Sequence, residues 1–304
     1  MSRSLRTFLE GAKLVIVAFV ASRLIIFAIM MLSRTIMVPT AWSHPGGLLS
    51  VLTQWDGELW YIQIARHGYY ISSGAHLPHN FWPFYPILIK LTSFVFRDLR
   101  VAAIVVSHVC LLLGALCLNA LIRLDYKDPR VSRAALVLFL FSPVSFFFSN
   151  AYTESTFFAL ATGAFLAARK GQWLVACLCG MCLSATRQVG ILIALPLFLE
   201  FLLQFWTRSA RLGGWRGLVT PRVLLLGLIP CGIGMHMLYC YIAFGDAFMF
   251  SRAARAWGRS FTSPVDTILF LRTYTTFYYI LFLSALLVTL AILFSGVLLR
   301  IRAT

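Results

Sequence analysis

The chain has 304 residues, of which 60% are hydrophobic and 12% are charged, and its mean hydropathy is +0.85. This composition excludes an ordinary soluble domain, because such domains carry about 25% charged residues. Lys and Arg number 26 against 10 acidic residues, which gives a formal net charge of +16. Because membrane proteins concentrate cations on cytoplasmic loops, this excess does not call for nucleic acid as a partner.

Apolar runs recur along the whole chain. A spanning helix takes about 20 residues, so eight spans fit the length, and we expect an all-α, polytopic integral membrane protein with a single domain over 1–304. The first run is expected to be an uncleaved anchor, and Pro143 and Pro196 predict kinks within their spans. The eight runs cover residues 14–32, 101–122, 134–149, 155–168, 173–185, 189–206, 223–244 and 274–299.

The distribution of Lys and Arg predicts the orientation of these spans. With the N-terminus in the cytoplasm, more than half of the cations fall on short inner segments, as the positive-inside rule requires. Residues 33–100 and 245–272 then form the first and last extracytoplasmic loops, and a bacterial plasma membrane is the expected location. The cations that remain outside suit an anionic lipid as substrate.

The first extracytoplasmic loop contains the segment QWDGELWYIQIARHGYY over residues 54–70. Leu59, Ile62 and Arg66 recur at helical spacing, which predicts a short helix at the membrane interface. One interpretation of this helix is an amphipathic membrane anchor. The other is a site built around Asp56. Further along, the segment HLPHNFWPFYPILIKL supplies an aromatic wall suited to a sugar or a lipid, and Pro78 argues against a metal-binding histidine pair in this segment.

Two more signals lie at the outer ends of predicted spans. Thr153 is a candidate cap for the helix that follows it, and Glu154 either favours the positive end of that helix or faces an outer cavity. Arg187 lies between two apolar runs, where it is either a snorkelling residue or a phosphate ligand.

The last outer loop carries a cluster of cations. Arg252, Arg255 and Arg259 are spaced by three and four residues, so a helix would place them on one face. This ridge suits either bulk anionic headgroups or one particular lipid phosphate. Asp246 precedes it.

An outer carboxylate, outer arginines and an apolar body suit chemistry on a lipid-linked anion. If the donor is a sugar on a polyprenyl phosphate, the leaving group is already a stable anion. The enzyme then needs a general base for the acceptor hydroxyl and cations for the phosphate. No cofactor is expected, although Asp56, Glu58 and Asp246 leave a divalent metal possible.

Five segments of the sequence together resemble a known family, the second mannosyltransferase of GPI-anchor synthesis (PIG-V type), in its shorter bacterial form. The order of the matching segments follows the family's order. They are QWDGELWYIQIARHGY, NFWPFYPILIKL, SNAYTESTFFAL, SATRQVGIL and FGDAFMFSRAARAWGR. The chain is shorter than full-length relatives, which predicts that later spans are missing.

The resemblance implies a GT-C type membrane glycosyltransferase. Such an enzyme takes a hexose, usually mannose, from a polyprenyl-phosphate donor on the non-cytoplasmic face and transfers it with inversion to a lipid or glycan acceptor. It implies that Asp56 is the general base. The residues expected to bind substrate, from the resemblance and from the loop patterns together, are Trp55, Glu58, Tyr61, Tyr69, Asn80, Tyr85, Glu154, Arg187, Asp246, Arg252, Arg255 and Arg259.

Two functions from other classes remain open on the residues alone. A catalytically inactive membrane scaffold would keep the fold without the chemistry. A lipid or sugar transporter would place ionisable groups near the membrane midplane, where the sequence offers Arg23 and, nearer an inner end, Glu200. Replacing Asp56 with Asn distinguishes these alternatives, because a scaffold or a transporter should tolerate the change and a base-dependent transferase should not. The acceptor and any partner subunit stay open.

Overall fold

A computed structural model describes residues 3–36, 47–71, 77–212 and 221–259, together with a few isolated positions up to residue 287. Within these residues the chain is helical and contains no strand, which confirms the all-α class. The expected last span, 274–299, lies outside the described residues apart from four positions. The chain divides into two compact units, Met1–Ala253 and Ala254–Thr304.

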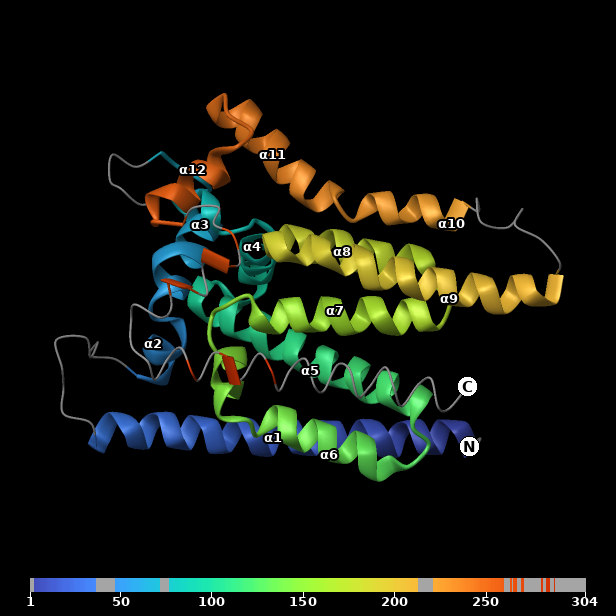
Figure 1. Cartoon of the computed structure of the whole chain (residues 1–304). Helices are drawn as coiled ribbons and strands as arrows, with labels where there is room; N and C mark the ends of the chain where they lie inside the picture. The colour runs from blue at the N-terminus through green and yellow to red at the C-terminus, as the bar shows by residue number, and fades with distance from the viewer. Residues whose placement is uncertain are drawn as a thin grey trace. The chain divides into compact units, whose positions relative to one another are not determined.

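The first unit contains almost all of the described helices (Figure 1). In chain order the elements are α1 (Arg3–Ile36), α2 (Leu48–Thr53), η1 (Gly57–Tyr61), α3 (Ile62–His67), η2 (Pro78–Asn80), α4 (Phe84–Phe96), α5 (Leu99–Asp125), α6 (Pro129–Leu140), η3 (Pro143–Ser149), α7 (Glu154–Arg169), α8 (Trp173–Thr186), η4 (Gln188–Ile193), α9 (Ala194–Leu212), α10 (Pro221–Leu224), η6 (Leu225–Leu228), α11 (Cys231–Phe244) and α12 (Met249–Ala256).

Long apolar helices indicate an integral membrane protein. In the described part of the chain, four helical stretches are long and apolar enough to cross a membrane. The pair α6 and η3, bent by 75° at Pro143, makes five if it forms one broken span, and this bend confirms the predicted kink. The four stretches are Glu10–Ser33, Leu99–Asp125, Gln188–Phe205 and Leu225–Phe244.

The predicted number of about eight spans is not confirmed. The helices α7 and α8 have 16 and 14 residues, so at 1.5 Å per residue neither reaches the roughly 30 Å of a bilayer core. The helix α7 packs against the longer α5 and against α8. The apolar runs 155–168 and 173–185 located α7 and α8 closely, but each run was counted as a span.

Small residues allow the helices to approach closely. A Cβ atom at Gly114 of α5 would overlap the Phe158 ring of α7, so the glycine permits the α5–α7 contact. A group of buried apolar residues joins α7, α8, η4 and α9 around Trp173 and Phe201. Glu154 is the first residue of α7, and Arg187 directly follows the last residue of α8.

Arg23 of α1 is buried within a predicted span, with only 3% of its surface exposed. Its guanidinium donates hydrogen bonds to the Leu140 carbonyl and the Ser145 carbonyl at 2.9 Å each, and to the Ser149 hydroxyl at 2.7 Å. All of these acceptors are neutral and lie on α6 or η3. Arg23 therefore holds the bent α6–η3 pair against α1.

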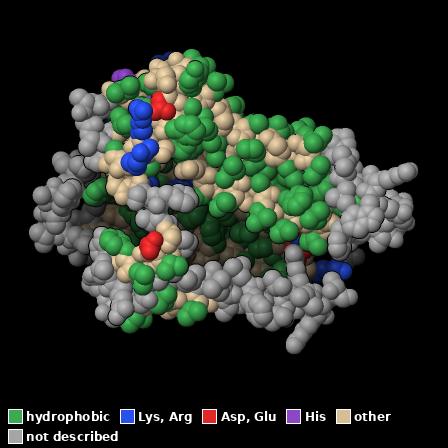
Figure 2. Space-filling view, turned by 45° about the horizontal axis from the view of Figure 1, so that its top comes forward, with side chains coloured by type: hydrophobic (Ala, Val, Ile, Leu, Met, Phe, Trp, Pro, Cys, Tyr) green, Lys and Arg blue, Asp and Glu red, His purple; other side chains and the backbone are tan. Residues whose placement is uncertain are grey.

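The short elements α2, η1 and α3 gather at the end of the helical body where α5 and α7 begin and α8 ends (Figure 1). The start of α1 lies at the opposite end. Figure 2 shows one face of the molecule, on which hydrophobic side chains cover the described middle part and the visible charged side chains lie toward its two ends. The candidate site is thus built at one polar end of an apolar helical body.

Candidate functional site

Asp56 stands at the start of a short helical segment, as the spacing of apolar residues predicts. Trp55 before it has a φ of +62°, a left-handed conformation that is uncommon for a non-glycine residue. The Leu59 N–H then donates to the Trp55 carbonyl at 3.0 Å and opens the π-helical turn η1, which runs directly into α3. This sharp entry leaves both Trp55 and Asp56 at the surface.

Gly57 brings the Asp56 segment against the loop before α7. A Cβ atom at Gly57 would lie 2.9 Å from the Ala151 Cβ and 3.1 Å from the Ala151 carbonyl oxygen. The Ala151 N–H donates to the Leu52 carbonyl at 2.8 Å. Two sequence segments almost 100 residues apart are therefore in backbone contact, and Asp56 is next to residues 151–154.

Tyr61 of η1 lies at the centre of this arrangement. It is buried, and the burial raises the pKa of its hydroxyl above the ordinary value. Thr153 and the charges of Arg187, Glu154 and Asp56 all act on the pKa of this hydroxyl. Tyr61 thus joins three of the predicted motif segments.

Glu154 and Arg187 form an ion pair, with 2.8 Å between Glu154 Oε1 and Arg187 Nη2. The two side chains are 25% and 42% exposed, so solvent screens the pair in part. The second oxygen, Oε2, is buried and has no hydrogen-bond donor within the described residues, and the same is true of Asn150 Oδ1. Two acceptor oxygens of this loop are thus buried without a donor among the described residues.

Tyr152 ties the Asp56 backbone to the same loop. Burial raises the pKa of Tyr152 to about 12, and the nearby Asp56 and Glu154 carboxylates act in the same direction, while a hydrogen bond from the Asp56 backbone opposes them. The Tyr152 hydroxyl therefore stays protonated. Tyr152 was not among the predicted site residues, although it lies inside the segment SNAYTES, which the sequence singles out.

The site combines the surface carboxylate of Asp56 with two acceptor oxygens, Glu154 Oε2 and Asn150 Oδ1, and with Arg187. Such a set of groups can take a proton from a hydroxyl group and bind a polyol. The sequence of this chain matches the family described as Mannosyltransferase (PIG-V) over residues 2–211. That match includes Asp56, Glu154 and Arg187. The chain belongs to the PIG-V mannosyltransferase family.

Curated PIG-V relatives match shorter stretches. "GPI mannosyltransferase 2" of Drosophila pseudoobscura pseudoobscura is 34% identical over 124 residues, which cover 38% of this chain and 26% of the relative. "GPI mannosyltransferase pigv-1" of Caenorhabditis elegans is 34% identical over 68 residues, which cover 22% of this chain and 10% of the relative. The chain thus matches about a quarter or less of the length of these relatives. No solved structure matches it significantly.

In this PIG-V chain, Tyr69 belongs to a neighbouring group of aromatic and histidine rings. Its ring centroid lies 5.3 Å from that of His79, 5.1 Å from that of His236 and 5.7 Å from that of Tyr239, and its hydroxyl donates to the Phe81 carbonyl. His79 is fully buried, and neither of its ring nitrogens has a hydrogen-bond partner among the residues described. Burial lowers the pKa of His79 to about 4, with a smaller contribution from His236.

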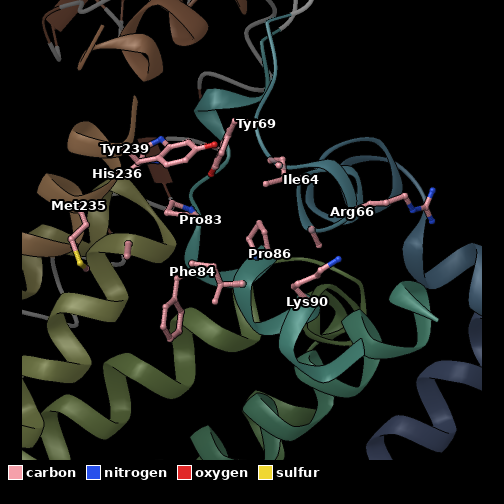
Figure 3. Close-up of a pocket in the computed structure, with 15 residues that line it drawn as sticks. Ile64, Arg66, Tyr69, Pro83, Phe84, Pro86, Lys90, Met235, His236 and Tyr239 are labelled. Atoms are coloured by element: carbon pink, nitrogen blue, oxygen red, sulfur yellow. The ribbon is translucent and has the colours of Figure 1, made fainter. Parts of the chain in front are cut away.

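A pocket of about 500 Å³ opens between α3, α4, α8 and α11, beside these rings. Its lining is mainly apolar. Figure 3 shows Arg66 of α3 and Lys90 of α4 on one side of the pocket, with Tyr69, His236 and Tyr239 on the other side. The sequence predicted Arg66 only as an outer cation on a short interfacial helix. It did not predict the pocket, because the pocket depends on how four helices meet.

Asn80 and Tyr85 occupy different surroundings. Asn80 ends η2 and is partly exposed. Tyr85 of α4 is fully buried, and its hydroxyl lies 3.1 Å from the Ala103 carbonyl and 2.8 Å from the Ser107 hydroxyl. Ser107 in turn donates to the Asn150 carbonyl at 2.8 Å. Tyr85 therefore supports the loop that carries Glu154, and it does not line the pocket.

The last loop differs in part from the prediction. Asp246 and Arg252 form an ion pair with a 2.8 Å separation, and Asp246 Oδ1 also accepts from the Phe248 N–H at 2.8 Å. The helix α12 ends at Ala256, so the expected helical face does not continue to Arg259. Arg255 and Arg259 are both exposed and belong to the second unit.

Two further predictions can be compared with the structure. Thr153 takes the N-cap position of α7, but its side chain makes no capping hydrogen bond, so the predicted cap is wrong. The Thr153 hydroxyl is buried and has no hydrogen-bond partner among the described residues. Within the described ranges, no group of three or more His, Cys, Asp or Glu side chains could hold a metal ion. Glu58 lies in η1 and is partly exposed.

Proposed function

We propose that this protein transfers a hexose, mannose in the first instance, from a polyprenyl-phosphate donor to a lipid-linked or glycan acceptor, with inversion. The observation that carries the proposal is the convergence of Asp56, Glu154 and Arg187 around Tyr61 in a chain of the PIG-V family. The site lies at the end of the helical body opposite the start of α1 (Figure 1). With a cytoplasmic N-terminus, as the positive-inside rule favours, the reaction takes place on the non-cytoplasmic face.

In this proposal Asp56 is the general base. Its carboxylate accepts the proton of the acceptor hydroxyl as the acceptor oxygen forms a bond to the anomeric carbon of the sugar. The bond between that carbon and the phosphate oxygen breaks, and its electron pair leaves with the polyprenyl phosphate, which gains one negative charge. Attack from the face opposite the leaving group inverts the anomeric centre.

The neighbouring residues bind and orient the sugar. Glu154 Oε2 and Asn150 Oδ1, which lack donors among the described residues, accept hydrogen bonds from sugar hydroxyls. Arg187 holds Glu154 in place through Oε1 and presents a positive charge to the site. Trp55, held at the surface beside Asp56 and 50% exposed, supplies an aromatic face against which a sugar ring packs.

The donor class is tested with purified protein in lipid nanodiscs. Labelled mannose is supplied on a polyprenyl phosphate in one reaction and as GDP-mannose in another, each with a native lipid and glycan extract as a source of acceptors. We expect label to move from the lipid donor only, and the labelled product then identifies the acceptor. Transfer from GDP-mannose, or transfer from neither donor, would contradict the proposal.

A further inference from the structure

The pocket between α3, α4, α8 and α11 has two cations among its lining residues that the proposed chemistry does not use. Arg66 and Lys90 are exposed and line the pocket, and neither makes an ion pair with any residue that the structure describes. No Asp or Glu lines the pocket. Figure 3 shows both side chains extending away from the pocket, with their charged ends outward.

The remaining walls are apolar. They come from Ile64, Pro86, Ile87, Met235 and the other lining residues of the four helices, and the volume of about 500 Å³ falls in the range of roughly 300–1,000 Å³ of small-molecule sites. Ile87 and Met235 are about half exposed, so the pocket is open to the surroundings of the helices. In a membrane protein those surroundings are lipid, which gives an apolar chain access from the side.

An apolar pocket that is lined on one side by two cations, neither of them ion-paired within the described residues, fits an amphipathic anion. The number of cations suggests which one. A phosphomonoester carries about −1.5 to −2 charges at pH 7, whereas the phosphodiester of an ordinary phospholipid carries one. Arg66 and Lys90 together match the charge of the monoester, and Arg supplies a planar fork of donors to phosphate oxygens.

The pocket is separate from the Asp56 carboxylate. Arg66 follows Asp56 by ten residues along the continuous η1–α3 segment, a distance of about 15 Å along a helix axis. Asp56, Glu154 and Arg187 are not among the lining residues. A ligand in this pocket is therefore held beside the reaction site and not at the reacting sugar.

We infer that this pocket binds a polyprenyl monophosphate, the carrier that remains after its sugar has been transferred. The first isoprene units lie between α4 and α11, and the phosphate lies between Arg66 and Lys90. This inference rests on the proposed function for the class of carrier. The reaction changes a singly charged diester into a monoester, so a site with two cations favours the released product over the donor and draws it away from Asp56.

Direct binding tests the inference without any transfer. Radiolabelled polyprenyl monophosphate is titrated against the full chain in phosphatidylcholine nanodiscs, and unlabelled polyprenol or phosphatidylglycerol is added as a competitor. We expect Arg66→Gln and Lys90→Gln each to raise the Kd about tenfold. Arg133→Gln, which removes an exposed cation on α6, leaves the Kd unchanged, and neither competitor displaces the ligand.

A second pair of variants tests the apolar wall. Met235→Trp places a larger side chain in the pocket and is expected to weaken binding, whereas Met235→Leu is expected to keep it. Unchanged binding in both Arg66→Gln and Lys90→Gln would overturn the inference. Displacement by phosphatidylglycerol at equal concentration would also overturn it and would assign the pocket to bulk anionic lipid.

The two proposals fail in different ways. If Asp56→Asn binds the monophosphate as the parent does while no sugar transfer is found in the parent, the proposed function is wrong and the lipid site remains. The opposite case is a parent protein that transfers sugar while Arg66→Gln and Lys90→Gln bind the monophosphate as the parent does. If added monophosphate also inhibits transfer by these variants as strongly as transfer by the parent, the pocket assignment is wrong and the proposed function remains.

Discussion

Gly57 packs against Ala151 so closely that a Cβ atom at position 57 would lie 2.9 Å from the Ala151 Cβ. This contact joins the segment that presents Asp56 to the loop that presents Glu154. The absence of a side chain at position 57 is thus what allows the two carboxylates to belong to one site. The sequence analysis singled out Trp55 and Asp56, and the structure gives a physical reason for the glycine that follows them.

Gly57→Ala should disrupt this contact. An alanine in a helical position would stabilise the fold by up to about 1 kcal/mol if space allowed, but the overlap with Ala151 is expected to reverse the sign and cost about 1–3 kcal/mol. Sugar transfer should fall at least about tenfold as Asp56 moves. Thermal unfolding and transfer rates of the variant in nanodiscs measure both effects.

Gly163→Ala is the matched control, because a Cβ atom at that helical glycine of α7 would lie at an ordinary 3.8 Å from the Cys179 sulfur. It should keep stability and transfer. The double variant Gly57→Ala with Ala151→Gly should recover part of the loss, since it removes one of the two overlapping methyl groups. A Gly57→Ala protein with parental stability and transfer would show that the contact is unimportant.

The Glu154–Arg187 ion pair should contribute more to activity than to stability. Because both side chains are partly exposed, removing the pair with Glu154→Gln or Arg187→Gln should cost about 1 kcal/mol or less of stability. We expect kcat/KM for transfer to fall roughly a hundredfold in each variant. In the double variant the loss should be little greater than in the worse single variant, because both residues act through one interaction. Additive losses in kcat/KM would mean that the two residues act independently.

His79 should make the protein sensitive to acid. Its folded-state pKa of about 4 lies below the ordinary 6.5, so the unfolded chain binds more protons between these values. The contribution of His79 to stability is therefore fully present above about pH 6.5 and is lost as the pH falls toward 4, at about 1.4 kcal/mol per pH unit. Denaturant unfolding of the parent and of His79→Phe at pH 7 and pH 5 measures the difference.

His79→Phe keeps an aromatic ring among Tyr69, Phe244 and the other rings of the cluster but has nothing to protonate. Its unfolding free energy should change less between the two pH values than that of the parent. An equal change in both proteins would show that His79 does not titrate in this interval, or that it is already accessible to protons in the folded state.

Arg23 should be important for the stability of the fold. Arg23→Met removes the donors to the Leu140 and Ser145 carbonyls and to Ser149 and leaves buried acceptors without partners. We expect a loss of about 3 kcal/mol. Arg23→Lys should recover little, since an ammonium group lacks the fork that reaches acceptors on α6 and on η3 at once. Thermal unfolding in nanodiscs measures both, and parental stability of Arg23→Met would contradict the assigned role.

The sequence was a good guide where one local pattern decided the structure. The apolar composition predicts the all-α class, Pro143 predicts the bend before η3, and the spacing of Leu59, Ile62 and Arg66 predicts the helix that follows Asp56. Each of these features depends on residues within a few turns of one another.

It was a poorer guide where distant segments meet. The contact of Tyr61 with Thr153 and the pocket between Arg66, Lys90 and His236 depend on the packing of helices far apart in the chain, which no local pattern encodes. Thr153 has a typical capping side chain, yet its buried hydroxyl makes no capping hydrogen bond. The helices α7 and α8, with 16 and 14 residues, are too short to cross a bilayer core, so the predicted number of about eight spans is not confirmed.

The central claim is that the Asp56 carboxylate removes the acceptor proton. The most direct measurement is the single-turnover rate of mannose transfer from the polyprenyl-phosphate donor by the parent and by Asp56→Asn. Asp128→Asn is the control, because Asp128 caps α6 at an exposed position where an amide caps a helix equally well.

The account predicts that Asp56→Asn binds the donor as the parent does but transfers mannose about 10²–10⁴ times more slowly, while Asp128→Asn keeps the parental rate. Equal rates in the parent and in Asp56→Asn would contradict it, and the base would then have to be sought elsewhere.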